Sequence, residues 1–229
     1  MTVPTDNRVR ITVWSDYVCP FCYLQEPVLE RIRAEYGERV EVERRAFELR
    51  PDPLPTLDPQ GEYLRTTWDR AVYPMARQRG MTLRLPPVQP RSRNALEAAE
   101  FARDQGRFDE MHNALFRAFF EEGRDLNELD VLLDAGMSVG LDREQLRAAL
   151  EEGRYTEKVL ADERLAYELG VQAVPTMLVG RASDPLEAAE ALSGAQPYEY
   201  VRAAVERALQ GNRREKLRGT TFLPQLPTL

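Results

Sequence analysis

The 229-residue sequence predicts an α/β fold in which a large all-helical segment interrupts a small sheet domain. Three observations support this prediction. Strand-like segments occur only near the two ends of the chain, while about a hundred residues between them have apolar side chains at three- and four-residue spacing. Two cysteines, three positions apart, follow the first predicted strand directly.

The amino-terminal part predicts a strand, a helix and a second strand. Residues 9–14, VRITVW, alternate apolar and other side chains with the period of a strand. Residues 23–37 follow with helical spacing, and Gly37 ends that helix. Pro27 lies inside it and should bend it, because proline removes one backbone hydrogen bond. Residues 39–49 predict the second strand, whose charged side chains indicate an edge position or a partly solvated face.

The middle of the chain predicts helices between two proline-rich segments and the last strands. Residues 48–60 form a Pro/Asp-rich loop, and residues 84–92 form a Pro-rich connector. Helical periodicity covers residues near 61–79, 93–105, 107–121, 126–138, 142–152 and 154–169.

The carboxy-terminal part predicts a strand at 171–180, a hairpin-like turn near 181–187, a weak strand at 190–193 and an amphipathic helix from 196 to 211. The apolar side of that helix consists of Tyr200, Val201, Ala204, Val205 and Ala208. The remaining tail predicts an extended or disordered arm. This order matches a thioredoxin-like fold split by a helical insertion. The expected parts are a thioredoxin-like domain at 1–58 plus 171–211, an insertion domain at 59–170 and an arm at 212–229.

Composition narrows the classes of function. The net charge of −7 and the pI near 5.1 argue against a nucleic-acid partner, which would need a basic stripe, and against an anionic membrane surface. The sequence shows neither a signal-like apolar segment nor a stretch of about 18 apolar residues, so a cytoplasmic location is expected.

The two cysteines of the chain, Cys19 and Cys22, predict thiol–disulfide chemistry. Pro20 suits the first turn of a helix, so Cys19 should lie at the helix N-terminus, where the dipole stabilises a thiolate. Cys22 follows one turn later on the same side and should be less exposed. The pattern therefore assigns Cys19 as the exposed nucleophile and Cys22 as the resolving thiol.

Other chemistry is less well supported. A closed zinc site needs four ligands, and the CxxC motif supplies two, although soft metals could bind the dithiol. His112, the single histidine, is interpreted as a surface or satisfied interior residue. Asp16 is interpreted as a turn cap in preference to a proton acceptor, and Trp14 as a core residue.

A second signal lies at Val174 and Pro175. A proline directly before the apolar run 177–179 would interrupt a central strand. One interpretation is a turn that enters an edge strand. Because the chain carries the CxxC motif, the favoured interpretation is a cis-proline loop that faces the cysteines.

Several motifs together resemble the DsbA-like proteins of the FrnE type. They are SDYVCPFCYL, FELRPDP, ALFRAFFEEGRDL, ELGVQAVPTMLVG and SGAQPYEYV, in the family's order, over about residues 9–210. The resemblance implies a thioredoxin fold with protein disulfide oxidoreductase or isomerase activity, with Cys19, Cys22 and the cis-proline Pro175 as site residues. Phe21 stands where periplasmic DsbA enzymes have histidine.

The expected function is thiol–disulfide exchange on protein or small disulfides, with Pro20, Phe21, Val174 and Pro175 binding substrate or tuning the couple. No bound cofactor is expected beyond the Cys19–Cys22 disulfide, and glutathione or a thioredoxin-type protein would be the reductant. The apolar tail is compatible with a homodimer. Two alternatives remain. One is a glutathione-dependent isomerase or transferase of a small aromatic substrate; such enzymes resemble this chain in architecture but typically have serine where Cys19 stands. The other is a soft-metal-responsive dithiol protein.

Phe21 offers neither a hydrogen bond nor a positive charge to the Cys19 thiolate. We expect Phe21→His to stabilise the reduced form and to raise the reduction potential, by about 30 mV for each 1.4 kcal/mol of stabilisation. Equilibration with glutathione buffers measures that potential. A lower potential in the variant would show that the side chain at position 21 does not face the thiolate.

Overall fold

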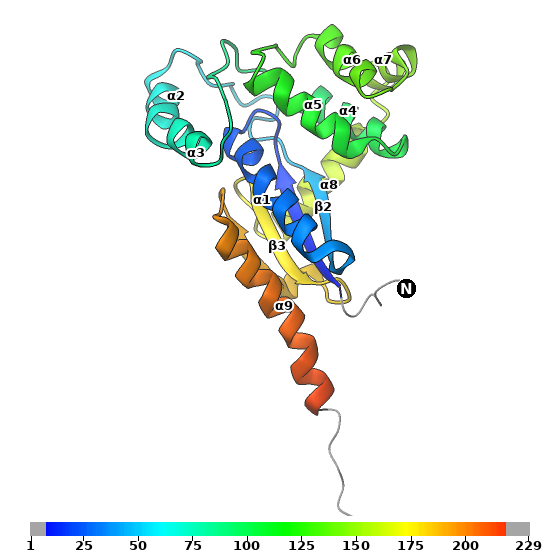
Figure 1. Ribbon diagram of the computed structural model, residues 1–229. Helices are drawn as coiled ribbons and strands as arrows, with labels where there is room; N and C mark the ends of the chain where they lie inside the picture. The colour runs from blue at the N-terminus through cyan, green and yellow to red at the C-terminus, as the bar shows by residue number, and fades with distance from the viewer. Residues whose placement is uncertain (1–7, 219–229) are drawn as a thin grey trace, which may run out of the picture.

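The computed structural model describes residues 8–218 and has one four-stranded mixed sheet (Figure 1). The strand order is β2-β1-β3-β4, with β1 parallel to β2, β3 antiparallel to β1, and β4 antiparallel to β3. The strands are β1 (Val9–Ser15), β2 (Val40–Ala46), β3 (Thr176–Arg181) and β4 (Glu190–Ser193). The charged strand β2 therefore lies at an edge, which is one of the two placements that its sequence indicates.

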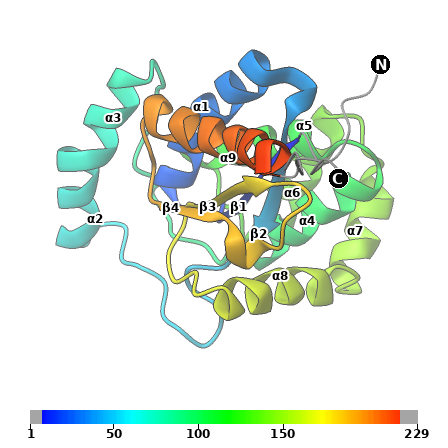
Figure 2. The same cartoon turned by 90° about the horizontal axis from the view of Figure 1, so that it is seen from below.

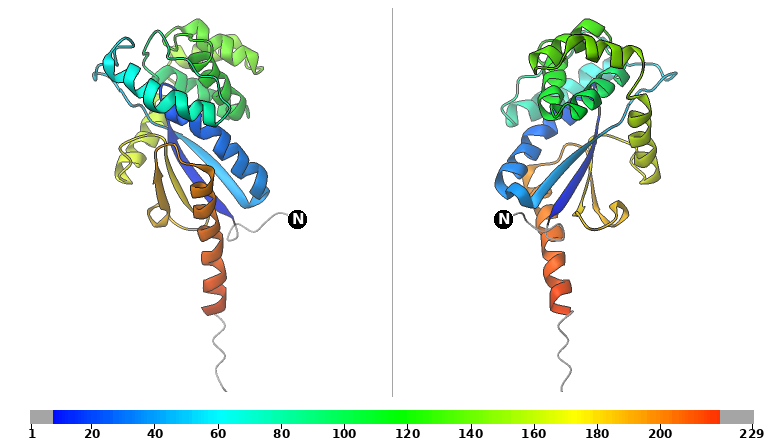
Figure 3. Two further views of the ribbon diagram at one scale, coloured as in Figure 1. Left: turned by 60° about the vertical axis from the view of Figure 1, so that its left-hand side comes forward. Right: turned by 90° about the vertical axis from the view of Figure 1, so that its right-hand side faces the viewer.

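Both faces of the sheet are covered. On one face, α1 (Pro20–Tyr36) and α9 (Tyr198–Arg218) pack side by side, and on the other lies α8 (Thr156–Glu168) (Figures 2 and 3). Val9, Ile11 and Val13 of β1 point toward α1 and α9 and join one buried cluster. Trp14 points the opposite way, is fully buried and donates from Nε1 to the Asp162 carbonyl of α8 at 2.9 Å, which confirms its core position.

Helices fill the chain between β2 and β3 and form a block at one end of the sheet (Figure 1). They begin with α2 (Glu62–Thr67), the π-helical turn η3 (Trp68–Val72) and α3 (Tyr73–Gln78), which follow one another without a break. The others before α8 are α4 (Arg93–Asp104), α5 (Phe108–Phe120), α6 (Leu129–Ser138) and α7 (Arg143–Glu151). Two short 3₁₀ turns, η2 (Gly37–Arg39) and η4 (Leu186–Ala188), complete the elements.

The helical block shares its apolar core with the cysteine end of the sheet. One continuous cluster contains Trp14 of β1, both cysteines and the aromatic residues of α5. The thioredoxin-like fold with a helical insertion is therefore the fold of this chain, and the block packs directly on the CxxC region.

Three details differ from the sequence predictions. The predicted strand at 171–180 begins only at Thr176, because Pro175 has no N–H to pair. Tyr200, predicted on the apolar side of the last helix, is 63% exposed, and Tyr198 occupies the buried position. Helix α9 runs on to Arg218, so the predicted arm at 212–229 starts as helix, and its residues 219–229 lie outside the described residues.

Leu29 tests how strongly α1 is bound to the sheet, because its side chain is fully buried between them. We expect Leu29→Ala to lower the free energy of unfolding by about 2–5 kcal/mol through lost burial and the cavity left behind. Urea denaturation measures the change. The exposed neighbour Glu30 is the matched control, and Glu30→Ala should change stability by less than about 0.5 kcal/mol.

Candidate functional site

The CxxC motif begins α1 at the end of β1. Cys19 is the N-cap residue with extended backbone angles, and Pro20 occupies the first helical turn. The amides of Cys22 and Tyr23 both point to the Cys19 carbonyl, at 3.1 and 3.4 Å. The sequence thus predicts the helix start correctly, since proline fits the first turn and needs no hydrogen-bond acceptor there.

The predicted exposure of Cys19 is wrong. Its side chain is 4% exposed and Cys22 is 1% exposed, and both are free thiols. Cys19 is covered because the loop before β3 packs on it: its thiol donates to the Val174 carbonyl at 3.5 Å, across 155 positions of sequence. The Val174 backbone thus lies directly on the Cys19 sulfur.

The Val174–Pro175 peptide bond is cis, and both residues are buried. The Pro175 carbonyl accepts from the Gly194 amide at 2.8 Å, which ties the loop to the turn after β4. Phe21 lies in the first turn of α1, half-buried against the same apolar cluster. The structure thus brings Cys19, Cys22, Val174 and Pro175 to one place, with Phe21 beside them.

Cys22 lies deeper and holds its proton more tightly than an ordinary thiol. Burial raises its pKa well above the usual value, and the neighbouring Cys19 raises it further. Two groups act in the opposite direction, the Ser15 hydroxyl and the Asp16 backbone amide, because both favour the thiolate. Ser15 Oγ itself is buried and has no hydrogen-bond partner among the described residues. Cys22 is therefore a thiol that stays protonated more readily than an exposed cysteine.

Asp16 is fully buried beneath this loop. Its carboxylate accepts from the Val18 amide at 3.2 Å, the cap predicted from sequence, and from the Leu49 amide at 2.7 Å. Burial raises the pKa of Asp16 to about 6, although these amides and Ser92 oppose the shift. The carboxyl thus joins the CxxC loop to the segment after β2.

A buried polar chain starts at Tyr17, two residues before Cys19. Its hydroxyl lies 3.0 Å from His112 Nδ1 on α5. His112 Nε2 lies 3.1 Å from Glu26 Oε1, off the line of a good hydrogen bond, and Glu26 pairs with Arg44 of β2 at 2.6 Å. Burial opposes ionisation of Glu26, but His112 and Arg44 outweigh it and lower its pKa to about 2.

The buried polar chain of Tyr17, His112, Glu26 and Arg44 is the main feature that the sequence did not reveal. Interior placement of His112 agrees with one of its two interpretations, yet its partners come from a loop, α1 and β2. One signal was present in the sequence: the charged residues Glu26 and Arg44 stand at positions that apolar periodicity assigns to buried faces.

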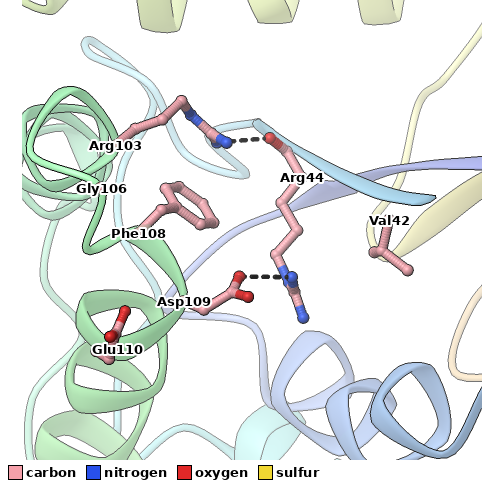
Figure 4. A pocket seen from close by; sticks show the side chains of 7 residues that line it. All are labelled: Val42, Arg44, Arg103, Gly106, Phe108, Asp109 and Glu110. Carbon is pink, nitrogen blue, oxygen red and sulfur yellow. Dashed lines mark hydrogen bonds and ion pairs between the residues drawn. The ribbon is translucent and has the colours of Figure 1, made fainter. Parts of the chain in front are cut away.

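Two open pockets lie near the buried polar chain of Tyr17, His112, Glu26 and Arg44. One, of about 240 Å³, lies beside the edge strand β2 and is lined by Val42, Arg44, Arg103, Gly106, Phe108, Asp109 and Glu110 (Figure 4). The two arginine side chains that line it already have partners: Arg44 pairs with Asp109 at 3.1 Å, and Arg103 donates to the Arg44 carbonyl at 2.8 Å. The other, of about 500 Å³, lies along α1 and includes Tyr23, Pro27 and Met81.

Two structural findings bear on other classes of function. Among residues 8–218, no helix is long and apolar enough to cross a membrane. Within the same residues, no group of three or more histidine, cysteine, aspartate or glutamate side chains is arranged to hold a metal ion.

Comparison of this sequence with known proteins identifies a family and a relative. Residues 10–206 match the model of the DSBA-like thioredoxin domain. The uncharacterized protein YwbO of Bacillus subtilis is 36% identical over 176 residues, which cover 75% of this chain and 87% of YwbO.

Solved structures agree with that match. A probable DsbA oxidoreductase from Streptomyces coelicolor is 26% identical, with a TM-score of 0.72 and coverage of 96% of this chain and 94% of its own. A 2-hydroxychromene-2-carboxylate isomerase is 19% identical, with a TM-score of 0.74 and coverage of 90% and 98%, which shows a shared fold.

Asp16 should make stability depend on pH in a characteristic direction. Its folded pKa of about 6 lies above the ordinary value of 3.8, so the folded state retains a proton that the unfolded state loses. Stability contributed by protonated Asp16 is therefore complete below pH 3.8 and falls as pH rises to about 6, by about 3 kcal/mol.

Asp16→Asn should remove this dependence. We expect urea denaturation to show that the free energy of unfolding of the Asp16→Asn variant, relative to that of the wild type, rises by about 3 kcal/mol from pH 3.5 to pH 7. Glu144→Gln, at an exposed position, is the control and should run parallel to the wild type. A constant difference between Asp16→Asn and the wild type across that range would contradict the assignment.

Proposed function

The chain belongs to the DSBA-like thioredoxin domain family, and from this membership we propose that it is a thiol–disulfide oxidoreductase that works through Cys19 and Cys22. One observation carries the proposal: two free thiols, one turn apart, begin a helix against the Val174–Pro175 loop. This arrangement supplies both the attacking thiol and the second thiol that the exchange requires.

In the proposed reaction, the Cys19 thiolate attacks one sulfur of a substrate disulfide. The substrate S–S bond breaks, one substrate thiolate leaves, and a mixed disulfide with Cys19 remains. The Cys22 sulfur then attacks Cys19, the mixed disulfide breaks, and the second substrate sulfur leaves as thiolate. The substrate is reduced by two electrons and the enzyme is oxidised to the Cys19–Cys22 disulfide, while the reverse sequence oxidises a dithiol.

Each site residue has a role in this proposal. The N-terminal dipole of α1 stabilises the Cys19 thiolate, and Pro20 allows the helix to begin at that point. Val174 and Pro175 form the wall along which an extended substrate segment would lie. Phe21, half-buried, adds an apolar surface beside the sulfur. Substrates are therefore proposed to be disulfide-containing proteins or small disulfides.

The partners follow from the same chemistry. A cycle in the reducing direction needs a dithiol protein or glutathione to return the Cys19–Cys22 disulfide to two thiols. We propose a cytoplasmic location for such a cycle, because thiols are kept reduced in that compartment.

A glutathione-dependent isomerase is the second candidate, favoured by the shared fold with the 2-hydroxychromene-2-carboxylate isomerase. The two candidates differ in what they require. Disulfide exchange needs both cysteines, whereas glutathione-dependent turnover of an aromatic substrate would survive Cys22→Ser. Reduction of insulin disulfides by the wild type, lost in both cysteine variants, would decide for the oxidoreductase.

Cys22→Ser should trap the intermediate. We expect this variant to form a long-lived mixed disulfide with an insulin-type substrate, because Cys19 attacks but nothing resolves the product. Cys19→Ser should form little, since Cys22 is 1% exposed. Mass spectrometry of the quenched mixture detects the adduct. Equal trapping through Cys22 alone would reverse the two roles.

A further inference from the structure

The turn that follows β4 connects the Val174–Pro175 loop to helix α1. Its first residue, Gly194, has a positive φ of 78°, which glycine adopts without strain, and its amide donates to the Pro175 carbonyl at 2.8 Å. Two positions later, the Gln196 amide donates to Gln25 Oε1 of α1 at 2.7 Å. The turn 194–196 therefore contacts both the loop that covers Cys19 and the helix that begins there.

The helical block holds the same turn from a third side. Arg79, the residue after α3, donates from Nη2 to the Gln196 carbonyl at 2.9 Å and from Nη1 to the Leu24 carbonyl of α1. Figure 2 shows the start of α9, which follows the turn, beside α1 and α3. Side chains therefore bind both backbone groups of Gln196, one from α1 and one from the helical block.

Gln25 is a polar residue in a buried position. It belongs to the buried side of α1 and is 1% exposed. A buried amide is costly unless its polar atoms are paired, and Gln25 Nε2 has no partner among the described residues. Burial alone thus gives no reason for a glutamine here. What this side chain supplies, and an apolar one would not, is the acceptor for the Gln196 amide.

These contacts form a closed ring that includes the Cys19 sulfur. The ring runs from the Cys19 thiol to the Val174 carbonyl at 3.5 Å, and through the next residue of the loop to Gly194. It returns through the turn to Gln25. Helix α1 closes the ring, because Gln25 stands six positions after Cys19, about 9 Å along the helix axis. The turn 194–196 therefore sets where the loop lies relative to the sulfur.

We propose that Gln25 and Arg79 are positioning residues, which through the turn 194–196 hold the Val174–Pro175 loop as the wall for an extended peptide beside Cys19. The inference rests on the proposed function, because it concerns how a substrate disulfide is presented to that thiol. A peptide that lies along the loop is aligned with the sulfur only while the loop is in place. A small disulfide needs the thiol alone.

Two substrates with the same leaving group test this difference. One is a symmetrical aromatic disulfide of a coloured thiol, and the other is a short extended peptide whose single cysteine is joined to that coloured thiol. The aromatic thiol leaves from both, since a thiol of lower pKa leaves faster. In the Cys22→Ser protein no second thiol follows, so the colour released in a stopped-flow instrument measures the attack by Cys19.

We expect Gln25→Met and Arg79→Met, each added to Cys22→Ser, to slow release from the peptide by at least about tenfold, because the loop is no longer held in line with the sulfur. Release from the aromatic disulfide should be no slower than in the Cys22→Ser parent. Alkylation of Cys19 by iodoacetamide should be faster, since a displaced loop covers the thiol less. If one variant fails to fold, the other decides the question.

Two control variants separate positioning from lost stability. Leu29→Ala removes buried surface from the same helix, but Leu29 packs against the sheet in the cluster that contains neither cysteine. Gln78→Met changes the exposed position before Arg79. Both controls, added to Cys22→Ser, should leave the ratio of the peptide rate to the aromatic rate unchanged.

Three outcomes overturn the inference: equal slowing with both substrates, parent rates with both substrates in the Gln25 and Arg79 variants, or the same selective slowing in Leu29→Ala. None of these affects the proposed function, which requires only that Cys19 and Cys22 exchange with a disulfide. Absence of colour release from both substrates in the Cys22→Ser parent would instead contradict the proposed function itself.

Discussion

The site depends on one constraint, which is that β1 is buried on both faces. Val9, Ile11 and Val13 pack under α1 and α9, while Trp14 packs toward α8. A strand covered in this way cannot slip by one residue, since a slip would exchange its two faces. The end of β1 is therefore fixed in space, and with it the loop that positions Cys19 at the start of α1.

The helical block is the second part of that constraint. Its apolar cluster includes both cysteines and Trp14, so the block excludes water from the inner side of the CxxC motif. Because of this, Cys22 is buried and its pKa is raised, while Cys19 stands at the helix N-cap. The same insertion that shapes the fold thus gives Cys22 its buried surroundings.

Sequence patterns predicted the elements well where the cause is local. The helix start at Cys19 and Pro20 follows from proline's missing N–H, and the edge position of β2 follows from its charges. Predictions failed where the cause is a distant contact. Cys19 is covered by Val174, 155 positions away, and His112 contacts Tyr17, 95 positions away. Periodicity describes one element at a time and contains no information about such pairs.

A buried chain of polar side chains, Tyr17, His112, Glu26 and Arg44, lies in the core near the cysteines. Burial in the same apolar surroundings raises the pKa of Cys22. Buried charges are costly unless they are paired, and Glu26 meets this requirement by contacting both Arg44 and His112. Removing Arg44 would leave the Glu26 carboxylate as an uncompensated buried charge. Burial lowers the pKa of His112 although Glu26 opposes that shift, so the ring lies beside the ion pair inside an otherwise apolar core.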